Sequence, residues 1–68
     1  MYNVRYTGQS SRDKVDRSGT LLGAKRLGTK NAEYGMDITI LDDSDRAIWH
    51  KEFWSVGNNF GWNNWVEI

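Results

Sequence analysis

The chain contains no cysteine and a single histidine, His50, and this lack of cross-linking side chains limits what so short a sequence can fold into. Disulfides need cysteine, and a structural zinc site normally needs four nitrogen or sulfur ligands. A chain of 68 residues is then left with burial of large aromatic side chains and association with another subunit. Four tryptophans supply the first of these. We therefore expect one small domain over residues 1–68, built around tryptophans and without metal or cofactor.

Two segments alternate apolar and polar residues with the period of a half-buried strand. In residues 2–7, Tyr2, Val4 and Tyr6 share one face. Residues 62–68 also alternate apolar and polar side chains, so we predict a second strand there.

The clearest local pattern spans residues 34–54, where two alternating runs flank the acidic cluster 42–45. This arrangement predicts a β-hairpin with a four-residue loop. With Leu41 opposite Arg46, the predicted register places Ile38 opposite Trp49 in the core. On the other face it pairs Asp37 with His50.

The remaining segments are polar or rich in glycine. Residues 8–19 predict a long polar loop, and residues 55–61 predict turns. Residues 20–27 contain good helix formers, but Gly19, Gly23 and Gly28 recur closely, so an irregular or bulged strand is favoured. The predicted fold class is all-β: a small antiparallel sheet, or a partly open SH3-like barrel, of four to five strands.

No motif for catalysis or metal binding stands out. The predicted neighbours His50 and Asp37 are two members of a possible triad, but a cross-strand charge pair is the commoner arrangement. The acidic cluster 42–45 lacks the glycine and the closing glutamate of a calcium loop, and the glycine spacing fits no phosphate-binding motif. We expect a protein that is not an enzyme.

Charge is divided along the chain although the net charge is zero. Residues 1–30 hold seven Lys or Arg and two Asp, a net charge of +5, whereas residues 31–68 hold two Lys or Arg and seven Asp or Glu, a net charge of −5. A basic surface of this kind could bind single-stranded nucleic acid. The candidate residues are Arg12, Lys14, Arg17, Lys25, Arg26 and Lys30.

Aromatic and amide side chains are interleaved near the end of the sequence. Aromatics in this setting suit a protein interface, and flanking amides also suit a sugar. The candidate partner-binding residues are Trp54, Phe60, Trp62 and Trp65. Strand alternation places Trp62 and Trp65 on opposite faces, so we expect one of them to be exposed or in a contact.

The first functional hypothesis is a non-enzymatic binding or regulatory protein that acts through protein–protein contacts and self-associates as a homo-oligomer. The alternative is a single-stranded nucleic-acid-binding protein, and a weaker alternative is a carbohydrate-binding module. No run of 18 apolar residues and no signal-peptide pattern is present, so we expect a soluble, cytoplasmic protein with no membrane partner.

Overall fold

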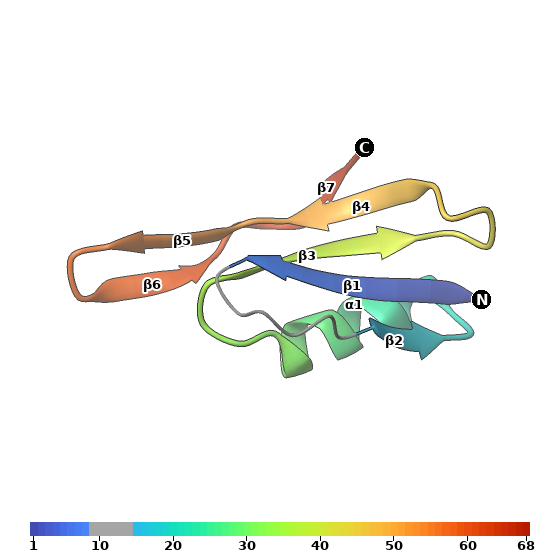
Figure 1. Cartoon of the computed structure of the whole chain (residues 1–68), viewed down its shortest axis with the longest axis horizontal. Helices are drawn as coiled ribbons and strands as arrows, with labels where there is room; N and C mark the ends of the chain where they lie inside the picture. The colour runs from blue at the N-terminus through green and yellow to red at the C-terminus, as the bar shows by residue number, and fades with distance from the viewer. Residues whose placement is uncertain (9–14) are drawn as a thin grey trace.

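The computed structural model describes residues 1–8 and 15–68, which form a mainly β fold with one helix (Figure 1). The elements in chain order are β1 (Tyr2–Gly8), β2 (Val15–Ser18), α1 (Leu21–Asn31), β3 (Met36–Leu41), β4 (Ala47–Lys51), β5 (Phe53–Val56), β6 (Asn59–Trp62) and β7 (Val66–Glu67).

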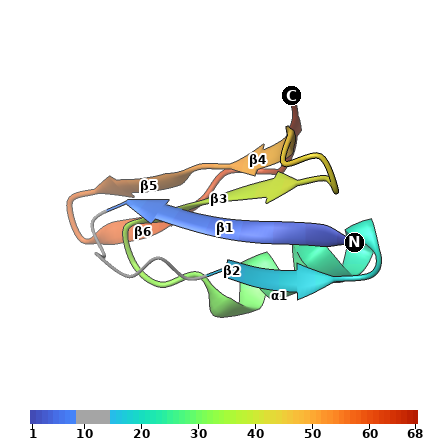
Figure 2. The same ribbon diagram turned by 45° about the vertical axis from the view of Figure 1, so that its right-hand side comes forward.

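Five of the strands form one antiparallel sheet in the order β2-β1-β3-β4-β7. Strands β2 and β3 flank β1, and helix α1 connects them across one face of the sheet (Figure 2). Strands β5 and β6 form a separate two-stranded hairpin that extends beyond the end of this sheet (Figure 1). The predicted small antiparallel sheet of four to five strands is therefore confirmed with five strands, and the β5–β6 hairpin is additional to it.

The core lies between α1 and the sheet face that it covers. Alternate side chains of β1 and β3 point toward the helix, which is the reason for the alternation in the sequence. The buried cluster consists of Val4, Tyr6, Ala24, Met36, Ile38 and Ile40. Arg5 and Thr7 of β1 are exposed, as the predicted strand 2–7 required.

The prediction of an irregular strand over residues 20–27 was wrong, because this segment is the first part of α1. Thr20 caps the helix: its side-chain oxygen accepts a hydrogen bond from the backbone N–H of Gly23 at 3.0 Å. The glycines serve close packing. A Cβ at Gly28 would lie 2.9 Å from Cγ2 of Ile38, so the missing side chain lets the helix approach the sheet.

The predicted loop over residues 8–19 needs a similar correction. Strand β1 continues to Gly8, and residues 15–18 form β2 by pairing with β1, with Val4 opposite Asp16. Residues 9–14 lie outside the described part of the chain.

The predicted hairpin around the acidic cluster is present as β3 and β4, but its register was wrong. Ile40, not Ile38, lies opposite Trp49, and Ile38 lies opposite Lys51. Two changes cause this: Leu41 lies opposite Ala47 instead of Arg46, and the pairing shifts by one further residue between Ile40 and Leu41. Alternation in the sequence reveals neither.

The same shift changes the other face of the hairpin. His50 pairs with Thr39 instead of Asp37, and its Nδ1 lies 3.2 Å from the Thr39 hydroxyl oxygen. Asp37 accepts a hydrogen bond of 2.8 Å from the backbone N–H of Phe53. The predicted pair of Asp37 and His50 is therefore absent.

The segment after β4 also differs from the prediction. Residues 55–61, predicted as turns, belong to the β5–β6 hairpin, whereas the predicted C-terminal strand over residues 62–68 is reduced to β7. Gly57 and Asn58 form the two-residue turn. Gly57 has φ of 60°, which glycine adopts readily at the first position of a type II′ turn.

A polar network ties α1 to β1 and β2 beneath the sheet. The Tyr6 hydroxyl donates a hydrogen bond of 2.7 Å to Oδ2 of Asp16 and lies 3.2 Å from the carbonyl oxygen of Leu27. The Asn31 side-chain amide donates to the same Asp16 oxygen at 2.9 Å. Burial of the phenol raises the pKa of Tyr6, and the hydrogen bond to Asp16 and the charge of Asp16 raise it further.

Replacing Tyr6 by phenylalanine should lower the free energy of unfolding by about 1–2 kcal/mol at neutral pH, because a hydrogen bond to a charged group is lost. The raised pKa also predicts an alkaline effect. Above about pH 10 the unfolded chain ionises Tyr6 while the folded chain keeps the proton, so the wild type loses stability as pH rises. Urea unfolding between about pH 7 and pH 11 measures both effects.

The alkaline loss should be smaller in Tyr6→Phe than in the wild type. Tyr34→Phe is the control for stability at neutral pH, because Tyr34 is exposed and its substitution should change stability by less than about 0.5 kcal/mol. Equal losses in the two variants, or identical alkaline slopes for Tyr6→Phe and wild type, would contradict the role assigned to the network.

Candidate functional site

The first candidate surface is the β5–β6 hairpin, residues 53–62, which we call the aromatic arm. Phe53 lies opposite Trp62, and Trp54 lies opposite Gly61. On one face, Phe53, Phe60 and Trp62 form edge-on or tilted ring contacts with centroids 5.4–6.2 Å apart. On the other face, Trp54 covers the space over Gly61, where a Cβ would lie 3.2 Å from its ring.

The arm is anchored to the main sheet at its base. The indole N–H of Trp62 donates a hydrogen bond of 2.7 Å to the carbonyl oxygen of Met36. Tyr34, from the segment before β3, packs edge-on against both Phe53 and Phe60 with centroids 4.9 Å apart. These contacts fix how the arm leaves the body of the protein.

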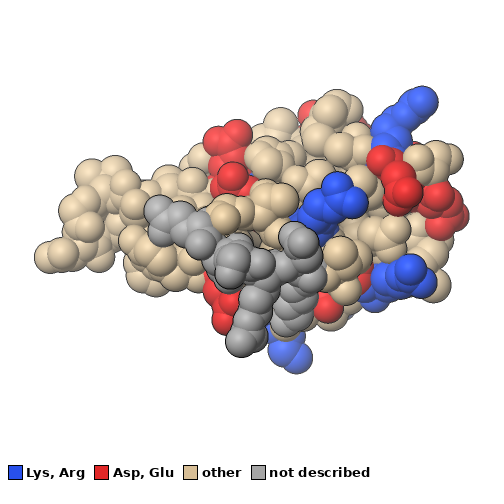
Figure 3. Space-filling model, viewed as in Figure 1, with Lys and Arg blue, Asp and Glu red and all other residues tan. Residues whose placement is uncertain are grey.

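The arm is apolar, exposed and uncharged. Residues 53–62 contain no Lys, Arg, Asp or Glu, and the corresponding end of the molecule carries no charged side chain in the space-filling view (Figure 3). Val56 is 72% exposed, Phe60 52% and Trp54 39%, and the neighbouring Tyr34 is 55% exposed. Such a gathering of exposed large apolar side chains is typical of an interaction site.

The second candidate surface is a hollow of about 420 Å³ between α1 and Trp65, which we call the basic groove. Its described lining contains no carboxylate and consists of Leu22, Lys25, Arg26, Thr29, Lys30 and Trp65. The helical spacing of the α1 residues puts them on one side of the helix. Trp65 closes the groove and packs against the helix at Gly28, where a Cβ would lie 3.3 Å from the indole.

The cations around the basic groove contact aromatic rings. The ammonium of Lys25 lies 3.3 Å from the centre of the Trp49 ring, and that of Lys51 lies 5.4 Å from the centre of the Trp65 ring. Lys51 also donates a hydrogen bond of 3.4 Å to the Thr29 hydroxyl oxygen. Within residues 1–8 and 15–68, the ion pairs are Met1 with Asp43 and His50 with Glu52, so neither neutralises the groove.

The structure divides the predicted partner-binding residues between the two surfaces. Trp54, Phe60 and Trp62 belong to the aromatic arm, whereas Trp65 belongs to the basic groove. Trp62 and Trp65 are both half-buried, and each is held by contacts of its own.

The predicted basic residues are only partly brought together. Lys25, Arg26 and Lys30 lie side by side along α1, while Arg17 is exposed on β2. Arg12 and Lys14 lie outside the described residues.

Sequence reasoning missed several members of both surfaces. The missed members are Phe53 in the arm, Tyr34 packed against it, and Leu22, Thr29 and Lys51 at the groove. The turn pair Gly57-Asn58 was the local sequence signal for a hairpin in this segment. The groove has no such signal, because it forms where α1 meets Trp65, which is distant in the sequence.

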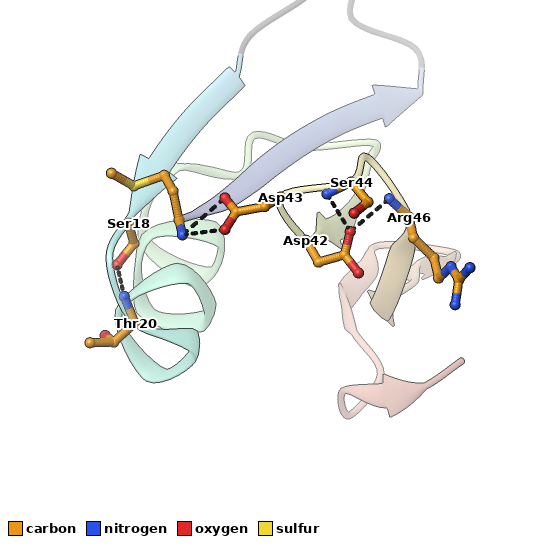
Figure 4. A network of polar contacts seen from close by, with 7 residues as sticks. Ser18, Thr20, Asp42, Asp43, Ser44 and Arg46 are labelled. Carbon is orange, nitrogen blue, oxygen red and sulfur yellow. Dashed lines mark hydrogen bonds and ion pairs between the residues drawn. The ribbon is translucent and has the colours of Figure 1, made fainter.

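The acidic turn between β3 and β4 has a structural role (Figure 4). Oδ1 of Asp42 accepts hydrogen bonds from the backbone N–H groups of Ser44 and Arg46, at 2.9 and 3.0 Å. Asp43 instead points to the amino group of Met1, with an oxygen 3.0 Å away. No described group of three or more His, Cys, Asp and Glu side chains is arranged to hold a metal ion.

A second hollow, of about 360 Å³, lies beside β4 and β7 and has acidic residues on its wall. Its charged or titratable lining residues are His50, Glu52 and Glu67. The two hollows therefore differ in sign: the described lining of one carries Lys and Arg, and that of the other carries Glu.

Among the described residues, α1 is the only helix, and it is neither long nor apolar enough to cross a membrane. No protein-family model matches the chain, and neither a curated protein nor a solved structure gives a significant match.

Proposed function

We propose that the protein is a small non-enzymatic binding protein that acts through protein–protein contacts, and that the aromatic arm joins two copies of the chain. The observation that carries this proposal is the arm itself: ten consecutive uncharged residues that project from the sheet and expose Trp54, Val56 and Phe60.

The physical argument rests on what such a hairpin needs. An isolated two-stranded hairpin is marginally stable in water, and contact with another surface would cover its apolar faces. The centres of protein interfaces are depleted in charged residues and enriched in aromatic ones, which matches residues 53–62. A chain of 68 residues without cysteine also gains more from a partner subunit than a larger domain would.

A second copy is the partner that we favour, because the arm is uncharged and exposes large apolar side chains on both of its faces, so two arms can pack against each other about a two-fold axis. Such a contact contains no ion pairs at its centre. Its strength should therefore change little with salt, in contrast to binding that depends on Lys or Arg.

The test is a single lysine at the tip of the arm. Val56→Lys should raise the dimer dissociation constant by at least about tenfold, because a lysine charge would be buried in an apolar contact. Sedimentation velocity over a wide range of protein concentration gives this constant for the wild type and the variant.

Val15→Lys is the matched control, since Val15 is also an exposed strand valine, 53% exposed, but lies on β2. It should dimerise like the wild type. A wild type that stays monomeric at every concentration, or an equal loss in the two lysine variants, would overturn self-association through the arm.

A further inference from the structure

We propose that the basic groove is a binding site for single-stranded nucleic acid, with phosphates on the Lys and Arg side chains of α1 and a base against Trp65. This site is separate from the aromatic arm, so it stands or falls independently of the proposed self-association. It rests on the juxtaposition of four cations and one half-buried indole around the same hollow.

The charge of the groove favours an anionic ligand. Lys25, Arg26 and Lys30 line it, and Lys51 borders it through its contacts with Thr29 and Trp65. The described residues provide no ion-pair partner for these four side chains.

The spacing of the cations suits a chain of phosphates better than a single anion. Arg26 and Lys30 are four residues apart on a helix, which places them one turn from each other along its axis. A ligand that follows the groove therefore meets one cation after another. This is the arrangement by which proteins track a nucleic-acid backbone.

The aromatic member of the groove favours an unpaired strand. Trp65 offers an apolar plane beside the cations, and a base can stack on such a plane only when it is not held inside a duplex. Leu22, 59% exposed at one end of the groove, extends the apolar surface.

The first experiment measures binding of a fluorescently labelled oligothymidylate by anisotropy at several salt concentrations. Four phosphate contacts predict a log–log slope of affinity against salt of roughly −3, at about −0.7 per phosphate for a single strand. The double variant R26Q/K30Q should bind roughly tenfold more weakly at low salt, with a slope nearer to about −1.4. Arg26 and Lys30 are both exposed, so the fold should be unaffected.

The matched control is R5Q/R46Q, which removes two exposed arginines that do not line the groove. It should keep nearly the affinity and slope of the wild type. Equal weakening by the two double variants would mean that binding follows total charge, and the groove would then not be the site.

The second experiment tests the indole. Trp65→Phe should retain most of the affinity and Trp65→Leu should lose most of it, with near-ultraviolet circular dichroism and unfolding midpoints checking that both variants fold. Three results would each overturn the proposal: no wild-type binding at low salt, tighter binding of a duplex of equal length, or tighter binding of an acidic peptide. Equal affinities of the two Trp65 variants would show that no base stacks on this indole, and would also overturn the proposal.

Discussion

Replacing Ile38 by alanine should lower the free energy of unfolding by about 2–5 kcal/mol. Ile38 is 1% exposed and lies at the centre of β3, directly beneath α1. The helix backbone rests on this side chain, because a Cβ at Gly28 would lie 2.9 Å from its Cγ2. Removing three carbons there leaves a cavity between helix and sheet that rigid backbone on both sides cannot fill.

The loss is large for a chain of this length, because native proteins have roughly 0.05–0.15 kcal/mol of stability per residue. Chemical unfolding followed by far-ultraviolet circular dichroism measures it. Leu22→Ala is the matched control: it also shortens an aliphatic side chain, but Leu22 is 59% exposed and alanine favours the helix. Equal losses at the two positions would mean that α1 does not cover Ile38.

The strands that could be predicted from the sequence are those that bury one face and expose the other, because this arrangement makes apolar and polar residues alternate. The alternation of Tyr2, Val4 and Tyr6 predicted β1, because α1 covers only one side of the sheet. The alternation around residues 42–45 predicted β3 and β4 for the same reason. The register between these strands was not predictable, because the pairing of Leu41 with Ala47 across the turn and the further shift beside Ile40 together move it by two residues and leave the alternation of side chains unchanged.

Helix α1 was missed because the glycines were judged by helix propensity alone. Gly23 and Gly28 do weaken a helix, but here a side chain at either position would collide with neighbours. A Cβ at Gly23 would lie 2.9 Å from the Thr20 hydroxyl oxygen that caps the helix. The position of Thr20, a capping residue just before a run of helix formers, was a signal that the sequence did carry.

The candidate surfaces were also predicted only in part, because residue types identify their members but not how those members come together. Residue types alone indicated Trp54, Phe60, Trp62 and Trp65 as partner-binding residues, and the arm holds the first three. Charge alone indicated Lys25, Arg26 and Lys30. That Trp65 and Lys51 would border the same groove depends on how α1 crosses the sheet, which no local pattern determines.

Replacing Gly8 by alanine should be among the most damaging single changes to the fold, although it adds only one carbon. Gly8 ends β1 with φ of 140°, a backbone conformation that residues with a side chain rarely adopt. It pairs with Met36, and a Cβ at Gly8 would overlap the carbonyl oxygen of Gly35 and lie 3.2 Å from Cα of Met36. Both obstacles are backbone atoms, so no side-chain rotation relieves the overlap.

The expected loss for Gly8→Ala is at least about 2 kcal/mol, from the strained φ together with the backbone shift that the overlap forces on the start of β3. Gly19→Ala is the control, because no atom lies within 4 Å of its added Cβ and its φ is not in the left-handed region. That variant should be neutral or up to about 1 kcal/mol more stable, since alanine restricts the unfolded chain. Urea unfolding of the two variants decides the matter: two alanines of equal effect would show that β1 does not end against residues 35–36.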